Sequence, residues 1–136
     1  MKSQKKTSNG IVDFQFAQKI VEKNARKKGG KTEIFNGLTT TKLRGLLSNV
    51  NRLYTIVFNT TSDELSNEFV NELEYLKIKF YYEASRENAV KIFLSEAKII
   101  EKLDMVIQDR SKTAFLDYCK YFEALVAYAK FNRMGD

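Results

Sequence analysis

Apolar residues recur along this chain at intervals of three and four positions, the spacing of helices that bury one face. A first helix is expected over about 12–28, where Gly29-Gly30 ends it, and a loop follows through about 29–38. The clearest expectation is a helix that starts after Thr39, whose hydroxyl can cap the free N–H groups of the first turn. Its apolar stripe consists of Leu43, Leu46, Leu47, Val50, Leu53, Tyr54 and Val57.

Three more helices are expected in the second half of the chain. Thr61 and Glu64 fit a capping box that opens the third helix, and a join to the fourth helix is expected near 84–88. The third stripe consists of Leu65, Phe69, Leu73, Leu76 and Phe80, and the fourth of Ala89, Phe93, Ala97, Ile100, Leu103 and Ile107. Ser111 is placed to cap a fifth helix that ends before Gly135.

The segment 115–131 is apolar around almost the whole circumference of a helical wheel. Its four charges, Asp117, Lys120, Glu123 and Lys130, fall in one arc of roughly 140°. Such a helix is normally buried inside a bundle or an assembly. Tyr121, Tyr128 and Phe131 lie within or beside the charged arc, so we expect them to be available to another chain.

The fold class that follows is all-α, a compact bundle of about five helices. The 136 residues contain no proline and suffice for one core, so we expect a single helical domain over 11–136 after a disordered basic arm at 1–10. The sequence contains no run of about 18 apolar residues, so no membrane span is expected. The polar N-terminus lacks the apolar segment of a secretory signal. The single cysteine, Cys119, cannot form an internal disulfide, so a cytoplasmic location is expected.

The composition argues against catalysis. Histidine is absent, which removes the usual general base and the commonest metal ligand. The sequence contains no dinucleotide-binding fingerprint, zinc-ligand spacing or calcium loop. We therefore expect no catalytic residues, no metal and no cofactor.

The net charge of +6 is concentrated at one end of the chain. Residues 1–31 carry nine basic and two acidic residues, so the rest of the chain is close to neutral. The basic stretch from 19 to 31 can bind nucleic acid through phosphates without reading its sequence. Equally, it can serve only to keep the chain soluble.

The polar face of the helix after Thr39 is the best candidate for a binding surface. No acid occurs over 34–62, whereas Arg44 and Arg52 share the polar side, roughly 12 Å apart along the helix axis. That separation can straddle neighbouring phosphates of a strand, and a close backbone approach would explain Gly45, which costs about 1 kcal/mol relative to alanine. Lys42 projects toward the edge of the apolar stripe. The alternative is a solvated face with an incidental glycine.

A second candidate is the aromatic stretch 75–82, which Lys77 and Lys79 interrupt. Lysines beside tyrosines can hold phosphates and stack bases. The alternative is that these tyrosines are core or interface residues whose hydroxyls stay wet.

Three segments together resemble one family. They read FNGLTTTKLR at 35–44, running on to NRLY at 51–54, then ELEYLKIKFYYE at 72–83, and FLDYCKYFEALVAYAK at 115–130. They are similar to the small helical subunit of the type III-A CRISPR effector, the Csm complex. The combination of the three is specific, whereas each alone is weak.

The resemblance implies a five-helix protein without enzymatic activity. In that family several copies stack along a complex that contains guide RNA, beside the backbone subunits, and contact the phosphate backbone of the target RNA. RNA cleavage belongs to the backbone subunits, and DNA cleavage and cyclic-oligoadenylate synthesis to the large catalytic subunit. By motif position the expected RNA contacts are Lys42, Arg44, Arg52, Lys77, Lys79, Lys120 and Lys130.

Two other hypotheses remain. The first is a helical adaptor that binds only protein and uses its basic residues for solubility. The second is DNA binding through a helix-turn-helix, which fits less well because no short recognition-helix pair is apparent.

Overall fold

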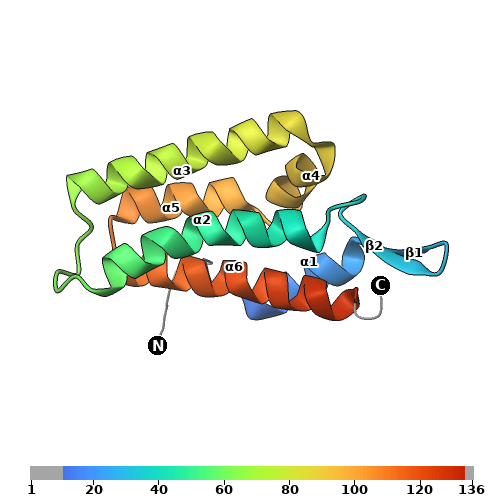
Figure 1. Ribbon diagram of the computed structural model, residues 1–136. Helices are drawn as coiled ribbons and strands as arrows, with labels where there is room; N and C mark the ends of the chain where they lie inside the picture. Colours follow the sequence, from blue (N-terminus) through green and yellow to red (C-terminus); the bar gives the residue numbers. More distant parts are fainter. Residues whose placement is uncertain (1–10, 134–136) are drawn as a thin grey trace.

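The computed structural model of the protein describes residues 11–133, so the arm expected at 1–10 lies outside the described residues. Within that range the chain forms six helices and one antiparallel two-stranded sheet (Figure 1). The elements are α1 (Phe14–Lys23), β1 (Ala25–Lys28), β2 (Lys31–Ile34), α2 (Thr40–Phe58), α3 (Asn67–Arg86), α4 (Asn88–Glu96), α5 (Ile99–Asp109) and α6 (Lys112–Asn132). The predicted class, a compact and predominantly helical bundle, is confirmed.

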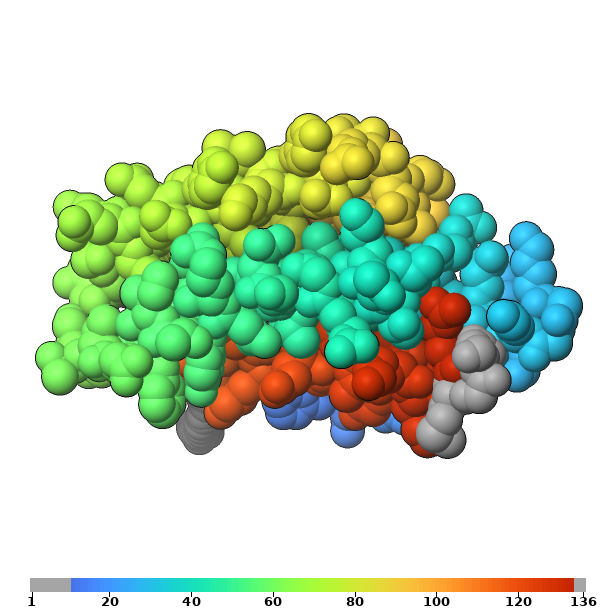
Figure 2. Space-filling model, viewed as in Figure 1, coloured from blue at the N-terminus to red at the C-terminus, as the bar shows by residue number. Residues whose placement is uncertain are grey.

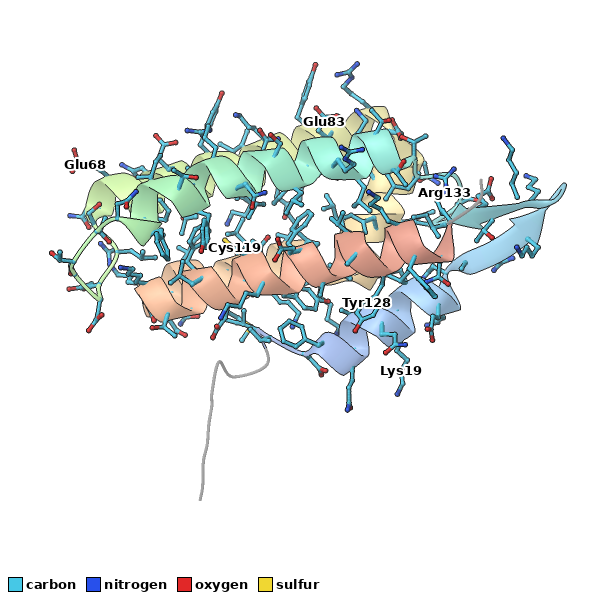
Figure 3. The ribbon with its side chains drawn as sticks, turned by 60° about the horizontal axis from the view of Figure 1, so that its bottom comes forward. Lys19, Glu68, Glu83, Cys119, Tyr128 and Arg133 are labelled. Carbon is cyan, nitrogen blue, oxygen red and sulfur yellow. The ribbon has the colours of Figure 1, made fainter. Side chains whose placement is uncertain are left out.

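Helix α6 is the centre of the bundle. It packs against α1, α2 and α5, and it runs antiparallel beside α2, with α3 above them (Figure 1). Buried side chains point from it in several directions, because the sequence is apolar nearly all round. The prediction that 115–131 is buried inside the bundle is therefore confirmed. In Figure 3, Cys119 lies in the interior, between α6 and the neighbouring helices.

Two tyrosines of α6 hold the junction between α4 and α5. The hydroxyl of Tyr118 donates a hydrogen bond to the carbonyl oxygen of Ile99 at 3.0 Å, and that of Tyr121 donates to the carbonyl oxygen of Ala97 at 2.8 Å. The Ala97 carbonyl lies at the C-terminal end of α4, where carbonyl groups have no partner within the helix, so the Tyr121 hydroxyl allows it to be buried. The Ile99 carbonyl begins α5, and the Tyr118 hydroxyl is a second donor to it. Tyr121 is 0% exposed, so the expectation that it is available to another chain is wrong.

Phe131 and Tyr128 were also expected to be available to another chain, and they differ in exposure. Phe131 is 70% exposed. Tyr128 is half-buried and lies between α6 and α1 in Figure 3.

The helix expected through 89–107 is in fact two helices. The break falls at Lys98, whose φ of 58° places it in the left-handed region. A glycine or proline usually marks such a break, and neither is present here, so the apolar stripe gave no sign of it. The join expected near 84–88 is confirmed, since α3 ends at Arg86.

Two of the three expected N-caps are confirmed. The hydroxyl of Thr39 accepts from the backbone N–H of Lys42, and that of Ser111 accepts from Ala114. The capping box at Thr61 is wrong, because α3 is capped instead by Ser66. The chain before Ser66 runs along the α5–α6 connection, where its backbone pairs with that connection rather than starting a helix.

The first helix ends earlier than expected, at Lys23, and a β-hairpin occupies 25–34. Gly29 and Gly30 have φ values of 61° and 85°, which suit a two-residue hairpin turn. Ile34 and Thr32 anchor the hairpin because their side chains are buried. The helix expected to continue to 28 and the loop expected over 29–38 are both corrected here. The charged residues 26–28 offered no apolar face that could have held a further helical turn against the core.

Replacing Tyr118 by phenylalanine tests the junction. Tyr118→Phe keeps the ring but removes this buried hydrogen bond to the Ile99 carbonyl, so we expect the free energy of unfolding to fall by about 1 kcal/mol. Urea denaturation measures this. Tyr75→Phe, at an exposed ring, is the control and should change stability by no more than about 0.5 kcal/mol. Equal stability of the two variants would contradict the role given to the hydroxyl.

The buried acids of α6 predict loss of stability in alkali. Burial raises the pKa of Cys119 and of Tyr118 above their ordinary values of 9.0 and 10.0. The unfolded chain therefore releases these protons first, and native stability falls as pH rises above about 9. Lys102, whose pKa burial lowers, acts in the opposite direction. The contribution of one group is therefore best measured by difference.

Between about pH 8 and pH 10 the free energy of unfolding should fall in both proteins. We expect the fall to be about 1 kcal/mol smaller in Cys119→Ala than in the wild type. Urea denaturation at the two pH values gives the two differences. Parallel losses in both proteins would show that the thiol keeps its ordinary pKa in the folded state.

Candidate nucleic-acid interface

The outer face of α2 is free of acidic residues. Its inner stripe packs into the core, and its outer positions are exposed. Figure 2 shows α2 across the middle of one face of the molecule, between α3 and α6. The exposed residues include Arg44, Ser48, Asn51, Arg52 and Thr55.

Arg44 is an exposed cation without an ion pair among the described residues. Gly45 follows it, and a Cβ added there would meet nothing within 4 Å. Gly45 also lines a hollow of about 320 Å³ at the α2–α3 boundary. The structure thus places an unpaired guanidinium next to a stretch of open helix backbone.

Lys42 and Arg52 are both engaged with α3. The Lys42 ammonium lies 3.0 Å from a carboxylate oxygen of Glu83 and 3.9 Å from one of Glu87. The Arg52 guanidinium lies 3.5 Å from a carboxylate oxygen of Glu72, and both of these side chains are about half exposed. An exposed pair of this kind contributes less than about 1 kcal/mol, so Arg52 can exchange its partner for another anion. Lys42, set between two carboxylates, is already neutralised locally.

The two lysines of α3 point to different neighbours. The Lys77 ammonium lies 2.7 Å from a carboxylate oxygen of Asp104 on α5, and this hydrogen bond raises the pKa of Lys77. Lys79 lies over the ring of Tyr75, with its ammonium 5.0 Å from the ring centre. Lys77 therefore serves the α3–α5 contact, whereas Lys79 stays on the outer side of α3.

A shallow groove follows the boundary between α2 and α3. The hollow beside Lys42 and a second one of about 450 Å³ beside Lys79 are both lined by Asn49 and Glu83. Figure 3 shows Glu83 on α3, facing the N-terminal part of α2. The structure brings Lys42 and Lys79 to this groove and leaves Lys77 outside it.

Lys120 and Lys130 are exposed on α6, and neither makes an ion pair within residues 11–133. Because α6 runs antiparallel to α2, Lys130 lies at the end of the bundle where α2 begins (Figure 1). A hydrogen bond from the Arg133 guanidinium to the Leu38 carbonyl oxygen, at 3.0 Å, joins these two ends. Arg44, Lys120 and Lys130 are thus the expected site residues that remain exposed and without ion pairs.

The aromatic stretch 75–82 lies mostly at the surface, so the interpretation that its tyrosines belong to the core is wrong. Tyr75, Ile78, Tyr81 and Tyr82 are 53–60% exposed, and only Leu76 and Phe80 of its apolar residues are buried. Positions 75, 78 and 82 have the spacing of one helix face, so they form an apolar stripe on α3. Contiguous exposed apolar surface of this kind marks sites of contact with other molecules.

The sequence pattern did not predict the basic β-hairpin formed by β1 and β2. Four cations surround the hairpin turn, although the sequence pattern predicted a helix end and a loop there: Arg26, Lys27, Lys28 and Lys31. The signal was present in the two glycines that separate two four-residue segments, an arrangement typical of a hairpin.

A hollow of about 740 Å³ lies between α3, α4 and α5, and none of the expected site residues lines it. Its lining mixes Arg86 and Lys91 with Glu101 and Asp104. Among residues 11–133 no group of three or more Asp, Glu, Cys or His side chains is arranged to hold a metal ion. No helix in the same range is long and apolar enough to cross a membrane.

Comparison with known proteins gives one consistent family. A family model described as Csm2 Type III-A matches residues 16–134. The CRISPR system Cms protein Csm2 of Enterococcus italicus is 53% identical, over 96% of this chain and 97% of its own length. Proteins of the same name from Mycobacterium tuberculosis and Streptococcus thermophilus are 33% identical over 88% of this chain and 37% identical over 69%. The resemblance found in the sequence is thereby confirmed, and the chain belongs to the Csm2 family, as a small subunit of a type III-A CRISPR complex.

Proposed function

We propose that the protein is a non-catalytic subunit that contacts the phosphate backbone of the target RNA independently of sequence. The contact is made through the surface that carries Arg44 and Arg52 on α2 and Lys120 and Lys130 on α6, the α2–α6 face. The observation that carries this proposal is Arg44, an exposed cation without an ion pair in the described chain, on a helix whose outer face has no acid. Contacts to phosphates position a protein without reading bases. Pairing with the guide RNA would supply the sequence specificity.

The state of each cation orders the proposed contacts. Arg44, Lys120 and Lys130 can accept a phosphate without giving up a carboxylate, and arginine can bind it through two parallel hydrogen bonds. Arg52 joins them by exchanging a weak, exposed pair with Glu72.

The three remaining lysines contribute less directly. Lys79 can approach a strand from the outer side of α3, where it now lies over a tyrosine ring. Lys42 and Lys77 mainly hold α3 against α2 and α5, so their replacement would disturb the bundle as well as any RNA contact.

The apolar stripe of α3 supports the protein partners of the proposal. Tyr75, Ile78 and Tyr82 offer aromatic and aliphatic anchors of the type that dominate protein interfaces. Phe131 adds an exposed ring at the end of α6. We assign these surfaces to the backbone and large subunits of the complex and to neighbouring copies of this chain.

The absence of catalysis is also part of the proposal. The chain has no histidine, and its single cysteine is buried with a raised pKa, which leaves no reactive thiolate. Cleavage chemistry is assigned to other subunits of the complex.

The α2 face is tested by Arg44→Ala combined with Arg52→Ala in the assembled complex. We expect weaker target-RNA binding for every sequence tested. The dependence of affinity on salt should also become shallower, by about 0.7 in the logarithmic slope for each single-strand phosphate that the variant no longer binds. Lys91→Ala, which removes an exposed lysine of α4 outside this face, is the control and should bind as the wild type.

An adaptor that binds only protein is the second candidate, and the exposed stripe of α3 favours it. It requires the arginine double variant to retain full RNA affinity while the complex still assembles. That result would remove the α2 face from the RNA-binding account.

Gly45→Ala separates the two explanations of the helix glycine. Alanine fits the space and favours the helix, so we expect the free energy of unfolding to rise by up to about 1 kcal/mol. We expect RNA affinity of the complex to fall, since the methyl group would stand where the strand approaches the backbone. A more stable variant with unchanged RNA affinity would show that the glycine is incidental.

A further inference from the structure

The β-hairpin stands out from the end of the helical bundle (Figure 1). In its register Arg26 lies opposite Glu33, Lys27 opposite Thr32, and Lys28 opposite Lys31. Residues opposite each other share a face, and alternate residues along a strand share it too. The hairpin therefore has an anchored face, with buried Thr32 and Ile34, and an outer face that carries Arg26, Lys28, Lys31 and Glu33.

The cations of the outer face lack ion pairs among the described residues. The single acid of that face is turned away, since a carboxylate oxygen of Glu33 lies 3.7 Å from the place of a Cβ on Gly37, in the loop that follows β2. Lys28 and Lys31 face each other across the turn, and like charges directly opposite destabilise a hairpin. An anion bound between them would remove that repulsion.

The hairpin holds these charges in place before any ligand arrives. The two turn glycines adopt the positive φ values that a two-residue turn requires. At its base the backbone N–H of Phe35 donates to the Asn24 carbonyl oxygen at 3.0 Å, and the Phe35 ring packs edge-on against Phe93, with ring centres 5.2 Å apart. An ordered ribbon loses little conformational entropy when it binds.

The composition of the outer face indicates the kind of partner. The centres of protein interfaces are rich in aromatic residues and poor in lysine. The outer face of the hairpin presents no apolar side chain, and lysine and arginine dominate it. Such a surface suits a phosphodiester backbone rather than a protein.

We propose that this hairpin is a second phosphate-binding element, which holds the backbone of the same RNA strand beyond the α2–α6 face. The inference rests on the proposed function, because it takes that strand to be the bound RNA. The position of the hairpin fits, since it lies at the end of the bundle where α2 begins and α6 ends (Figure 1). Each subunit would then contact the strand at two separate points.

The test uses the assembled complex with Lys28→Ala and Lys31→Ala together. We expect target-RNA affinity to fall several-fold near physiological salt, and the logarithmic salt slope to decrease by about 1.4, the value for two single-strand phosphate contacts. The matched control is Arg86→Ala with Lys91→Ala. It removes the same charge at exposed sites on α3 and α4, outside the basic stretch 19–31 and outside α2 and α6.

The Arg44→Ala variant, measured in the same complex, separates this inference from the proposed function. Loss of affinity in the Arg44 variant but not in the hairpin variant overturns the inference and leaves the proposed function intact. Loss in the hairpin variant alone supports the inference and removes α2 from the account. Full affinity in both variants overturns both proposals.

Two further outcomes also count against the inference. Equal losses in the hairpin variant and its charge-matched control would show a general effect of net charge. Loss of this subunit from the complex at unchanged RNA affinity would show that the hairpin binds protein. Thermal unfolding of the free subunit checks that the alanine variants remain folded.

Discussion

The bundle depends on two hydrogen bonds that leave the central helix and end on backbone carbonyl groups. Tyr118 and Tyr121 reach from α6 to the junction of α4 and α5, where the chain turns within the interior. Without the Tyr121 donor the Ala97 carbonyl at the end of α4 would be buried unpaired, at a cost of about 1–3 kcal/mol, and the Tyr118 bond adds about 1 kcal/mol. With them, α6 buries its apolar side chains on every side except the one that carries Lys120 and Lys130, and α1, α2 and α5 pack around it.

Basic side chains fall into two groups with different tasks. Lys42 and Lys77 are tied to carboxylates across helix boundaries, and Lys102 lies buried against the ring of Tyr121. These cations hold helices together. Arg44 and the hairpin cations have no such ties among the described residues, and they stand on elements whose backbones are fixed by packing elsewhere. The net charge of the chain thus says less about partners than the pairing of each cation does.

The sequence predicted what local patterns determine. The stripe of α2, its cap at Thr39 and the exposure of Arg44 follow from helical spacing alone. The α4–α5 break does not, because it places Lys98 in a conformation that costs energy locally and that only tertiary packing stabilises. The partner of Lys42 was equally hidden, since Glu83 follows 41 residues later and meets it only when α2 and α3 pack. Tyr121 was predicted to be exposed because it lies near the charged arc of the helical wheel. The wheel gives the direction of a side chain but does not show that the α4–α5 junction packs against it.

The buried thiol of Cys119 makes opening of the bundle measurable by its chemical reactivity. It is buried at the centre of α6, and its raised pKa keeps it protonated at neutral pH. An alkylating reagent, which reacts with the thiolate, therefore cannot modify Cys119 while the bundle is closed. Reaction requires an opening that brings the middle of the central helix into water, an event close to global unfolding. Since the chain has no other cysteine, the rate of its alkylation reports the opening of the bundle: the opening rate where alkylation is faster than reclosing, and the population of the open form where it is slower.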